Sequence, residues 1–130
     1  MKLGIIGCGA IGTDVAVYAD SMNEIEKIYL FDIDKKAEEK LVKRICKAKC
    51  KSVKDFLDDV DVVFEAASQK AVNEYAEIVL DAGKDLILMS VGSLFDDKFR
   101  DKLEDIVEAV SRLEEASQVN PLIQSCVKKR

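Results

Sequence analysis

The stretch that decides the fold is Leu3-Gly4-Ile5-Ile6-Gly7-Cys8-Gly9-Ala10-Ile11-Gly12, near the start of the chain. It begins with a short apolar run typical of a buried strand, and its last residues open a stretch with helical spacing over 10–22. The glycines between them follow the spacing GxGxxG. Asp32 ends a second apolar run, 28–31, and stands twenty positions after Gly12. This combination predicts a dinucleotide-binding unit, because it places a strand, the glycine spacing, a helix and an acid in the order and at the distance that such units require.

Each glycine of this loop has its own physical role. Gly7 permits a tight turn from strand to helix, Gly9 lets the backbone approach a ligand closely, and Gly12 lets the helix pack against the sheet. The free backbone amides at the start of the helix attract negative charge, to which the helix dipole adds. We therefore expect the pyrophosphate of a dinucleotide at Gly7, Gly9, Ala10, Ile11 and Gly12. The alternative is a tight turn that binds nothing.

Asp32 is expected to accept hydrogen bonds from the hydroxyl groups of the adenosine ribose. Its carboxylate would repel the 2′-phosphate of NADP, and the next residues, Ile33 and Asp34, supply no arginine to hold that phosphate. The sequence therefore favours NAD over NADP, with Asp32 and Ile33 at the adenosine end of the site. The alternative for Asp32 is an acid exposed to solvent at the end of a strand.

Short apolar runs alternate with longer amphipathic stretches along the rest of the chain. This alternation predicts a parallel sheet with right-handed crossovers and helices on both faces. The expected fold class is α/β, a Rossmann-type doubly wound parallel sheet with strand order 3-2-1-4-5. The expected strands are 3–6, 28–31, 48–51, 61–66 and 86–89. The expected helices are 10–22, 34–47, 69–82 and 96–115, with a short helix that Ser52 caps and that ends at 58. Gly83 follows the helix 69–82 and is expected to end it. We expect this domain to cover 1–115, and an extended or loosely packed tail to cover 116–130.

Two further segments follow the fourth and fifth expected strands, at the edge where open parallel sheets bind ligands. The small residues Ala66, Ala67 and Ser68 would let the nicotinamide half of the cofactor lie against the backbone. Ser90-Val91-Gly92-Ser93 follows the fifth strand, which makes Val91 and Gly92 further candidates for cofactor contacts. An ordinary loop with a serine that caps the next helix explains this second segment equally well.

The composition narrows the classes of function. A net charge of −5 and a pI near 4.9 argue against sequence-independent nucleic-acid binding, which needs a basic face. No apolar run reaches the ~18 residues that would span a membrane, and the N-terminus is not typical of a signal peptide, so we expect a cytoplasmic protein. The chain has four cysteines and no histidine. We predict no metal site, because structural zinc needs four converging nitrogen or sulfur ligands.

Three segments of the chain resemble the N-terminal domain of archaeal and bacterial L-aspartate dehydrogenases, which are relatives of the homoserine dehydrogenase-type NAD-binding domains. The segments are 5–12, 64–68 together with 71–72, and 88–94. The resemblance implies NAD(P)-dependent oxidative deamination of aspartate, with the cofactor on this domain. It also implies a second α/β domain that supplies the substrate pocket, a catalytic histidine and the dimer contacts. This chain has no histidine. We therefore expect an NAD(H)-binding domain that is catalytically incomplete alone, and we assign no catalytic residue.

Two alternatives to this function stay open. One is a stand-alone nucleotide-sensing or regulatory module that acts on a partner protein, and the other is a small reductase whose site is shared across a dimer interface. Without a second domain, the sheet edge beside the fifth strand would be uncovered, and exposed apolar edges tend to find partners. We expect a homodimer, or a partner that supplies the missing domain, to bury this edge or the long helix around Phe99, Ile106 and Val110.

Overall fold

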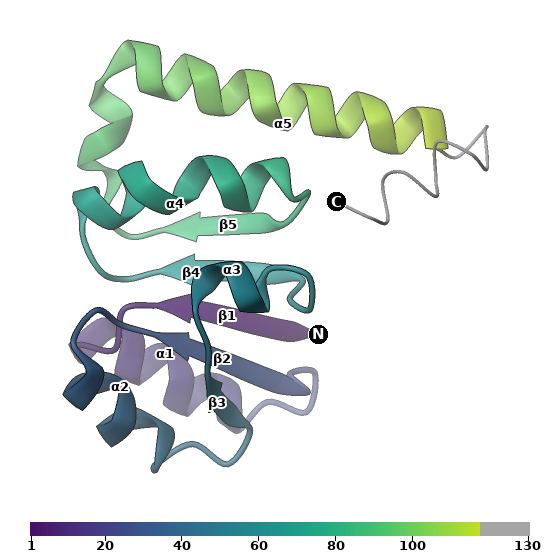
Figure 1. Cartoon of the computed structure of the whole chain (residues 1–130). Coiled ribbons are helices and arrows are strands. Elements are labelled where there is room, and N and C mark those ends of the chain that lie inside the picture. The colour runs from purple at the N-terminus through teal and green to yellow at the C-terminus, as the bar shows by residue number, and fades with distance from the viewer. Residues whose placement is uncertain (118–130) are drawn as a thin grey trace.

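The computed structural model describes residues 1–117, and 118–130, which make up most of the expected tail, lie outside the described part. Within the described residues a five-stranded parallel sheet has the order β3-β2-β1-β4-β5 (Figure 1), and this confirms the predicted topology. Its strands are β1 (Lys2–Ile6), β2 (Lys27–Phe31), β3 (Ala48–Cys50), β4 (Val62–Glu65) and β5 (Asp85–Leu88). The helices are α1 (Ala10–Asp20), α2 (Lys35–Val42), α3 (Val53–Phe56), α4 (Gln69–Asp81), the 3-10 helix η1 (Val91–Phe95) and α5 (Asp97–Ser117).

The central strands are buried on both faces because apolar side chains follow one another along them. On one face, Ile5 and Ile28 belong to a core that includes residues of α1 and α2. On the other face, Ile6 and Tyr29 pack with residues of α3 and α4. Figure 1 shows α1 behind the sheet and α3 in front of it. Each fully buried isoleucine contributes about 1.5–3 kcal/mol to stability, so this two-sided core holds the strands at their positions.

Helix ends are fixed by polar side chains and by one glycine. The hydroxyl of Ser52 accepts a hydrogen bond from the amide three residues further on, at 3.2 Å, which confirms the predicted cap. Gly83 follows α4 with φ +77°. Its amide donates to the carbonyl of Leu80 (3.0 Å), and the next amide donates to that of Val79 (3.3 Å). This is the Schellman pattern expected of a glycine that ends a helix.

α2 ends at Val42, although the sequence predicts a helix that continues to 47. The amides of Cys46 and Lys47 donate to the carboxylate of Asp20 on α1, at 3.1 and 3.0 Å. This contact turns the chain from α2 into β3, which must run parallel to β2. The predicted end was wrong because the apolar spacing continues to Ile45, which is buried beyond the end of the helix.

β5 is the outer strand of the sheet. Leu86 and Leu88 are partly buried against the core cluster that contains residues of α4 and α5. Ile87 and Met89 point to the opposite face, and each is 48% exposed. Among the described residues, the outer edge of this strand pairs with no other strand, and the face that carries Ile87 and Met89 is about half exposed.

The long helix α5 lies along α4 rather than on the sheet (Figure 1). Asp96 accepts hydrogen bonds from the amides of Lys98 and Phe99, and this caps the helix. Leu103 is buried, but Val107 is 45% exposed although the sequence places it on the same apolar stripe. Its exposure follows because α4 and η1, against which α5 packs, cover only part of the stripe. No helix among residues 1–117 has the length and apolar character needed to cross a membrane.

Candidate dinucleotide site

The glycine-rich loop that joins β1 to α1 excludes side chains at two of its glycines. Gly7 has φ +107°, which residues other than glycine rarely adopt. A Cβ atom at Gly7 would lie 2.8 Å from the carbonyl carbon of Ala66. At Gly12, a Cβ atom would lie 1.8 Å from the carbonyl oxygen of Gly7. Gly7 thus makes the turn, and Gly12 allows the helix to approach it.

Gly9 differs from these two glycines because the space on its Cβ side is open, with no atom within 4 Å. It is the N-cap of α1, and among the described residues no side chain caps the helix and no acid occupies its first turn. The amides of Ala10 and Ile11 therefore face an open surface with the positive end of the helix dipole. Gly9 and Ala10 also line a groove of about 360 Å³ between α1 and α2, whose other wall includes the basic Lys40 and Arg44.

Asp32 follows β2 and its carboxylate points to the glycine-rich loop. One oxygen, Oδ2, accepts a hydrogen bond from the amide of Cys8 at 2.7 Å. The other, Oδ1, accepts one from the amide of Asp34 at 2.8 Å. The backbone amide of Asp32 in turn donates to Oε2 of Glu38, at 2.9 Å. Each carboxylate oxygen has a second lone pair, so this fixed carboxylate can still accept ribose hydroxyl groups.

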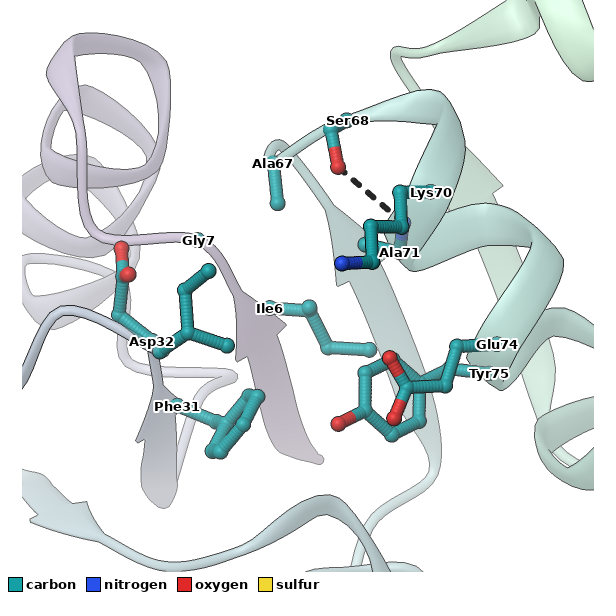
Figure 2. A pocket seen from close by; sticks show the side chains of 11 residues that line it. Ile6, Gly7, Phe31, Asp32, Ala67, Ser68, Lys70, Ala71, Glu74 and Tyr75 are labelled. Carbon is teal, nitrogen blue, oxygen red and sulfur yellow. Dashed lines mark hydrogen bonds between the residues drawn. The ribbon is translucent and has the colours of Figure 1, made fainter.

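A pocket of about 110 Å³ opens beside Asp32 (Figure 2). In the close-up, Asp32 and Phe31 lie on one side, and Lys70, Glu74 and Tyr75 on the other. The rings of Phe31 and Tyr75 meet edge to face, with centroids 5.8 Å apart. The full lining is Ile6, Gly7, Phe31, Asp32 and Ile33 from the ends of β1 and β2, and Ala67, Ser68, Lys70, Ala71, Glu74 and Tyr75 from the start of α4. An apolar floor with polar groups at the rim is suited to a flat heterocycle.

Ala67 and Ser68, two of the three residues predicted after β4, line this pocket, but Ala66 and the residues predicted after β5 do not. Ala67 and Ser68 line it, and the hydroxyl of Ser68 accepts a hydrogen bond from the amide of Ala71, at 3.1 Å. Val91 and Gly92 belong to η1 and are absent from the pocket lining. A Cβ atom on Gly92 would lie 1.8 Å from Nε2 of Gln69, the end of a flexible side chain that can move aside.

Sequence reasoning missed one residue of this region, Glu65. It ends β4 and is 1% exposed, and its carboxylate accepts hydrogen bonds from the loops that follow β4 and β5. The signal in the sequence is an acid at the end of the apolar run 62–64. Nothing in the sequence indicates which amides would donate to it, since these come from two separate loops.

The cysteine within the loop is buried rather than presented to a ligand. Cys8 is 5% exposed, and burial, together with the nearby Asp32 and Glu38, raises the pKa of its thiol to about 12. Burial and Glu38 likewise raise the pKa of the Cys50 thiol to about 11. Because the thiolate is the reactive form, the structure favours a packing role for Cys8 over a redox role.

The uncapped helix, the open glycine and the acid at the end of β2 define this chain as a dinucleotide-binding Rossmann domain. The profile of the homoserine dehydrogenase NAD-binding domain matches residues 7–113. The chain therefore belongs to that family of NAD-binding domains, and NAD(P) is the cofactor class of its site.

Relatives point to one branch of these domains. The chain is 36% identical over 107 residues to an L-aspartate dehydrogenase of Methanothermobacter thermautotrophicus, covering 82% of this chain and 42% of the relative. It is 38% identical over 115 residues to that of Methanocaldococcus jannaschii, covering 86% and 43%. The crystal structure of aspartate dehydrogenase from Thermotoga maritima superposes with a TM-score of 0.63 at 28% identity, covering 84% and 42%. The chain thus spans about two-fifths of the length of each, and it resembles their NAD-binding part.

Proposed function

We propose that this chain binds NAD(H) at the carboxyl edge of its sheet and serves as the cofactor domain of an aspartate dehydrogenase-like oxidoreductase. The observation that carries the proposal is the open N-terminus of α1 at Gly9 with the fixed carboxylate of Asp32 beside it. The first offers amides to a diphosphate, and the second offers a carboxylate to a ribose. NAD, when bound, supplies hydride transfer, and the residues of this chain hold and orient it.

The described geometry supports an order of contacts along the cofactor. The amides of Gly9, Ala10 and Ile11 would hold the pyrophosphate, and Asp32 would hold the adenosine ribose. The adenine would enter the pocket between Ile33 and α4, where the rim is polar and the floor aromatic. The nicotinamide half would extend towards Ala66, Ala67, Ser68, Val91 and Gly92.

The same residues support NAD over NADP as the cofactor. A 2′-phosphate would meet the carboxylate of Asp32, which is fixed by two backbone amides and cannot turn away without breaking both hydrogen bonds. Lys35 stands close to this end but pairs with Glu38 at 3.1 Å, with its ammonium group 4.9 Å from the ring centroid of Phe31. This lysine is therefore already engaged by an acid and a ring.

For the assembled protein we propose L-aspartate as the substrate, because the curated relatives carry that activity in their names. General acid–base catalysis needs a titratable group within hydrogen-bond reach of the transferred proton. The chain has no histidine, and the titratable side chains Lys70, Glu74 and Tyr75 line the pocket proposed for the adenine rather than for the reacting ring. We propose that catalytic groups come from another domain or chain, and that this chain alone does not oxidise aspartate.

We also propose that the outer edge of β5 is covered in the working protein by a second copy of the chain or by the domain that completes the enzyme. Ile87 and Met89 support this because they leave an apolar surface beside an unpaired strand edge. The thiols of Cys8, Cys46 and Cys50 are free, which supports a reducing, cytoplasmic location.

Calorimetric titration of the purified chain with NAD, NADH and NADP in parallel tests the cofactor proposal. We expect dissociation constants on the order of micromolar for NAD and NADH, and weaker binding of NADP. Gly9→Val would fill the open space at the helix N-terminus, and Asp32→Ala would remove the ribose acceptor. With either variant, the titration should therefore show no measurable heat of binding. Glu24→Gln, at the opposite edge of the sheet, is the matched control. Absence of binding by the unmodified chain would contradict the proposal.

A further inference from the structure

Glu65 is a buried acid whose position is not explained by the contacts of an ordinary strand end. It is the last residue of β4 and is 1% exposed. Most buried carboxylates in proteins are paired with a basic side chain or coordinate a metal ion. Among the described residues, the donors to Glu65 are backbone amides and one hydroxyl, none of them basic.

The donors come from two separate loops. Oε2 accepts from the amides of Ala67 (2.8 Å) and Ser68 (3.0 Å) in the loop between β4 and α4. Oε1 accepts from the amides of Met89 (3.2 Å) and Ser90 (2.9 Å) in the loop between β5 and η1. The hydroxyl of Ser90 completes the set by donating to Oε2, at 2.8 Å. The side chain of Glu65 thus holds both loops through hydrogen bonds from the end of β4.

These two loops are the ones that follow β4 and β5 at the edge where the cofactor is proposed to lie. The first contributes Ala67 and Ser68 to the pocket wall. The first loop also has independent support, because Ser68 caps α4 and the amide of Ala66 donates to the carbonyl of Ile6 at 2.8 Å. In the second loop, the amide of Met89 also donates to the backbone carbonyl of Glu65 (3.1 Å), and the hydroxyl of Ser93 donates to the carbonyl of Gln69 (3.2 Å). The amide and the hydroxyl of Ser90, however, both donate to the carboxylate of Glu65. Loss of Glu65 should therefore move the β5 loop more than the adenosine pocket.

We propose that Glu65 is a positioning residue that fixes the β5–η1 loop against the β4–α4 loop and thereby shapes the seat of the nicotinamide half of NAD. This inference rests on the proposed cofactor function. Glu65 itself is too deeply buried to touch the cofactor, so it acts through the backbone of the two loops. A carboxylate is suited to this place because it only accepts hydrogen bonds, whereas a glutamine would direct its NH₂ group at amides that can only donate.

The test compares ligands that contain different parts of the cofactor. ADP reports on the glycine-rich loop and the adenosine pocket, and NADH reports on these together with the nicotinamide seat. Glu65→Gln should lower the affinity for NADH by about tenfold or more, while the affinity for ADP should change by less than about twofold. The fluorescence of the bound dihydronicotinamide should also lose part of its enhancement at saturation, because the ring is held less firmly.

Ser90→Ala gives a milder variant, since it removes one donor from the β5 loop and leaves the carboxylate in place. We expect it to fold as the unmodified chain does and to lower the ratio of NADH affinity to ADP affinity by about threefold. It carries the test if Glu65→Gln does not fold. Glu74→Gln, at the pocket rim, is a control that should alter ADP and NADH affinity equally.

The outcomes separate this inference from the cofactor proposal. If the unmodified chain binds neither ADP nor NADH, the cofactor proposal fails and this inference fails with it. If the unmodified chain binds both ligands, but Glu65→Gln and Ser90→Ala lower the affinities for ADP and NADH by equal factors or leave both affinities unchanged, only the positioning role is wrong. A selective loss of NADH affinity supports the role, because a general loss of structure would lower both affinities.

Discussion

Asp32 and Cys8 are joined by a hydrogen bond of 2.7 Å, in which the amide of Cys8 donates to Oδ2 of Asp32. The acid at the end of β2 is therefore held against the loop that follows β1, although 24 positions separate the two residues in the chain. This contact places the proposed ribose acceptor and the proposed pyrophosphate site on one rigid unit.

Asp32→Asn should alter cofactor preference more than it alters folding. The asparagine keeps an oxygen that can accept from the Cys8 amide and loses only the hydrogen bond from the exposed Asp34 amide, which its NH₂ group then faces. It also removes the negative charge that opposes a 2′-phosphate. We expect the ratio of NAD affinity to NADP affinity to fall by about tenfold, measured by calorimetry with both ligands. An unchanged ratio would show that another group selects the cofactor.

Gly7→Ala and Gly9→Ala should separate folding from binding. An alanine at position 7 must adopt a positive φ, and its methyl group would meet backbone atoms of Ala66 and Ala67. We therefore expect the free energy of unfolding, measured with urea, to fall by at least ~2 kcal/mol. A methyl group at Gly9 meets open space, so stability should change by less than ~1 kcal/mol. NAD affinity should nevertheless fall in Gly9→Ala, because the methyl group occupies the surface offered to the pyrophosphate. Equal stabilities of the two variants would contradict the described loop geometry.

The raised pKa values of Cys8 and Cys50, about 12 and about 11, predict slow alkylation. At pH 8 both thiols stay protonated in the folded chain, whereas Cys46 is exposed. Iodoacetamide labelling followed by peptide mass spectrometry should modify Cys46 well before the other two. The same reaction in urea, where all thiols are accessible, serves as the control, and rapid labelling of Cys8 in the folded chain would refute the prediction.

Asp59 should make stability sensitive to acid. Hydrogen bonds from the Tyr29 hydroxyl and from Lys2, the latter at 2.9 Å, lower the pKa of Asp59 from 3.8 to about 2. Because the folded-state pKa lies below the unfolded value, its contribution to stability is complete above pH 4 and is lost as the pH falls from about 4 to about 2. Asp59→Asn should reduce the slope of unfolding free energy against pH in this interval. An identical slope in the variant and in the unmodified chain would show that other carboxyl groups dominate.

The apolar surface of β5 predicts self-association. At tens of micromolar, sedimentation velocity should show a dimer for the unmodified chain, if a second copy covers this surface. Ile87→Lys should produce monomers, because a lysine on this surface would be desolvated in the interface. Val17→Lys, at another exposed apolar position, is the matched control. A monomeric unmodified chain would exclude the homodimer and leave only a different partner for this edge.

Local signals in the sequence were enough to predict most of the fold. The strand order followed from alternating strands and helices, and the cap at Ser52 and the helix end at Gly83 followed from the preferences of single residues. The loop glycines and Asp32 can be proposed from the sequence because their spacing is confined to one βαβ unit, in which strand, helix and strand are consecutive. These features are determined by neighbours in sequence, or by the rule that such crossovers are right-handed.

Features that depend on distant contacts were not predictable. The end of α2 is determined by the carboxylate of Asp20 on another helix, and the exposure of Val107 by which helix α5 contacts. The part played by Glu65 depends on two loops that meet only when β4 and β5 pair. In each case the residue type gives no indication of its partner, because the partner is brought near by tertiary structure alone.

The contact between Gly12 and Gly7 restricts how this loop can change during evolution. Any side chain at position 12 would displace the oxygen of Gly7, and any side chain at position 7 would displace the backbone that follows β4. A substitution at either position therefore requires backbone atoms to move and lowers stability. Sequence drift in the loop is therefore directed to exposed sites such as Ile11, where a new side chain meets solvent.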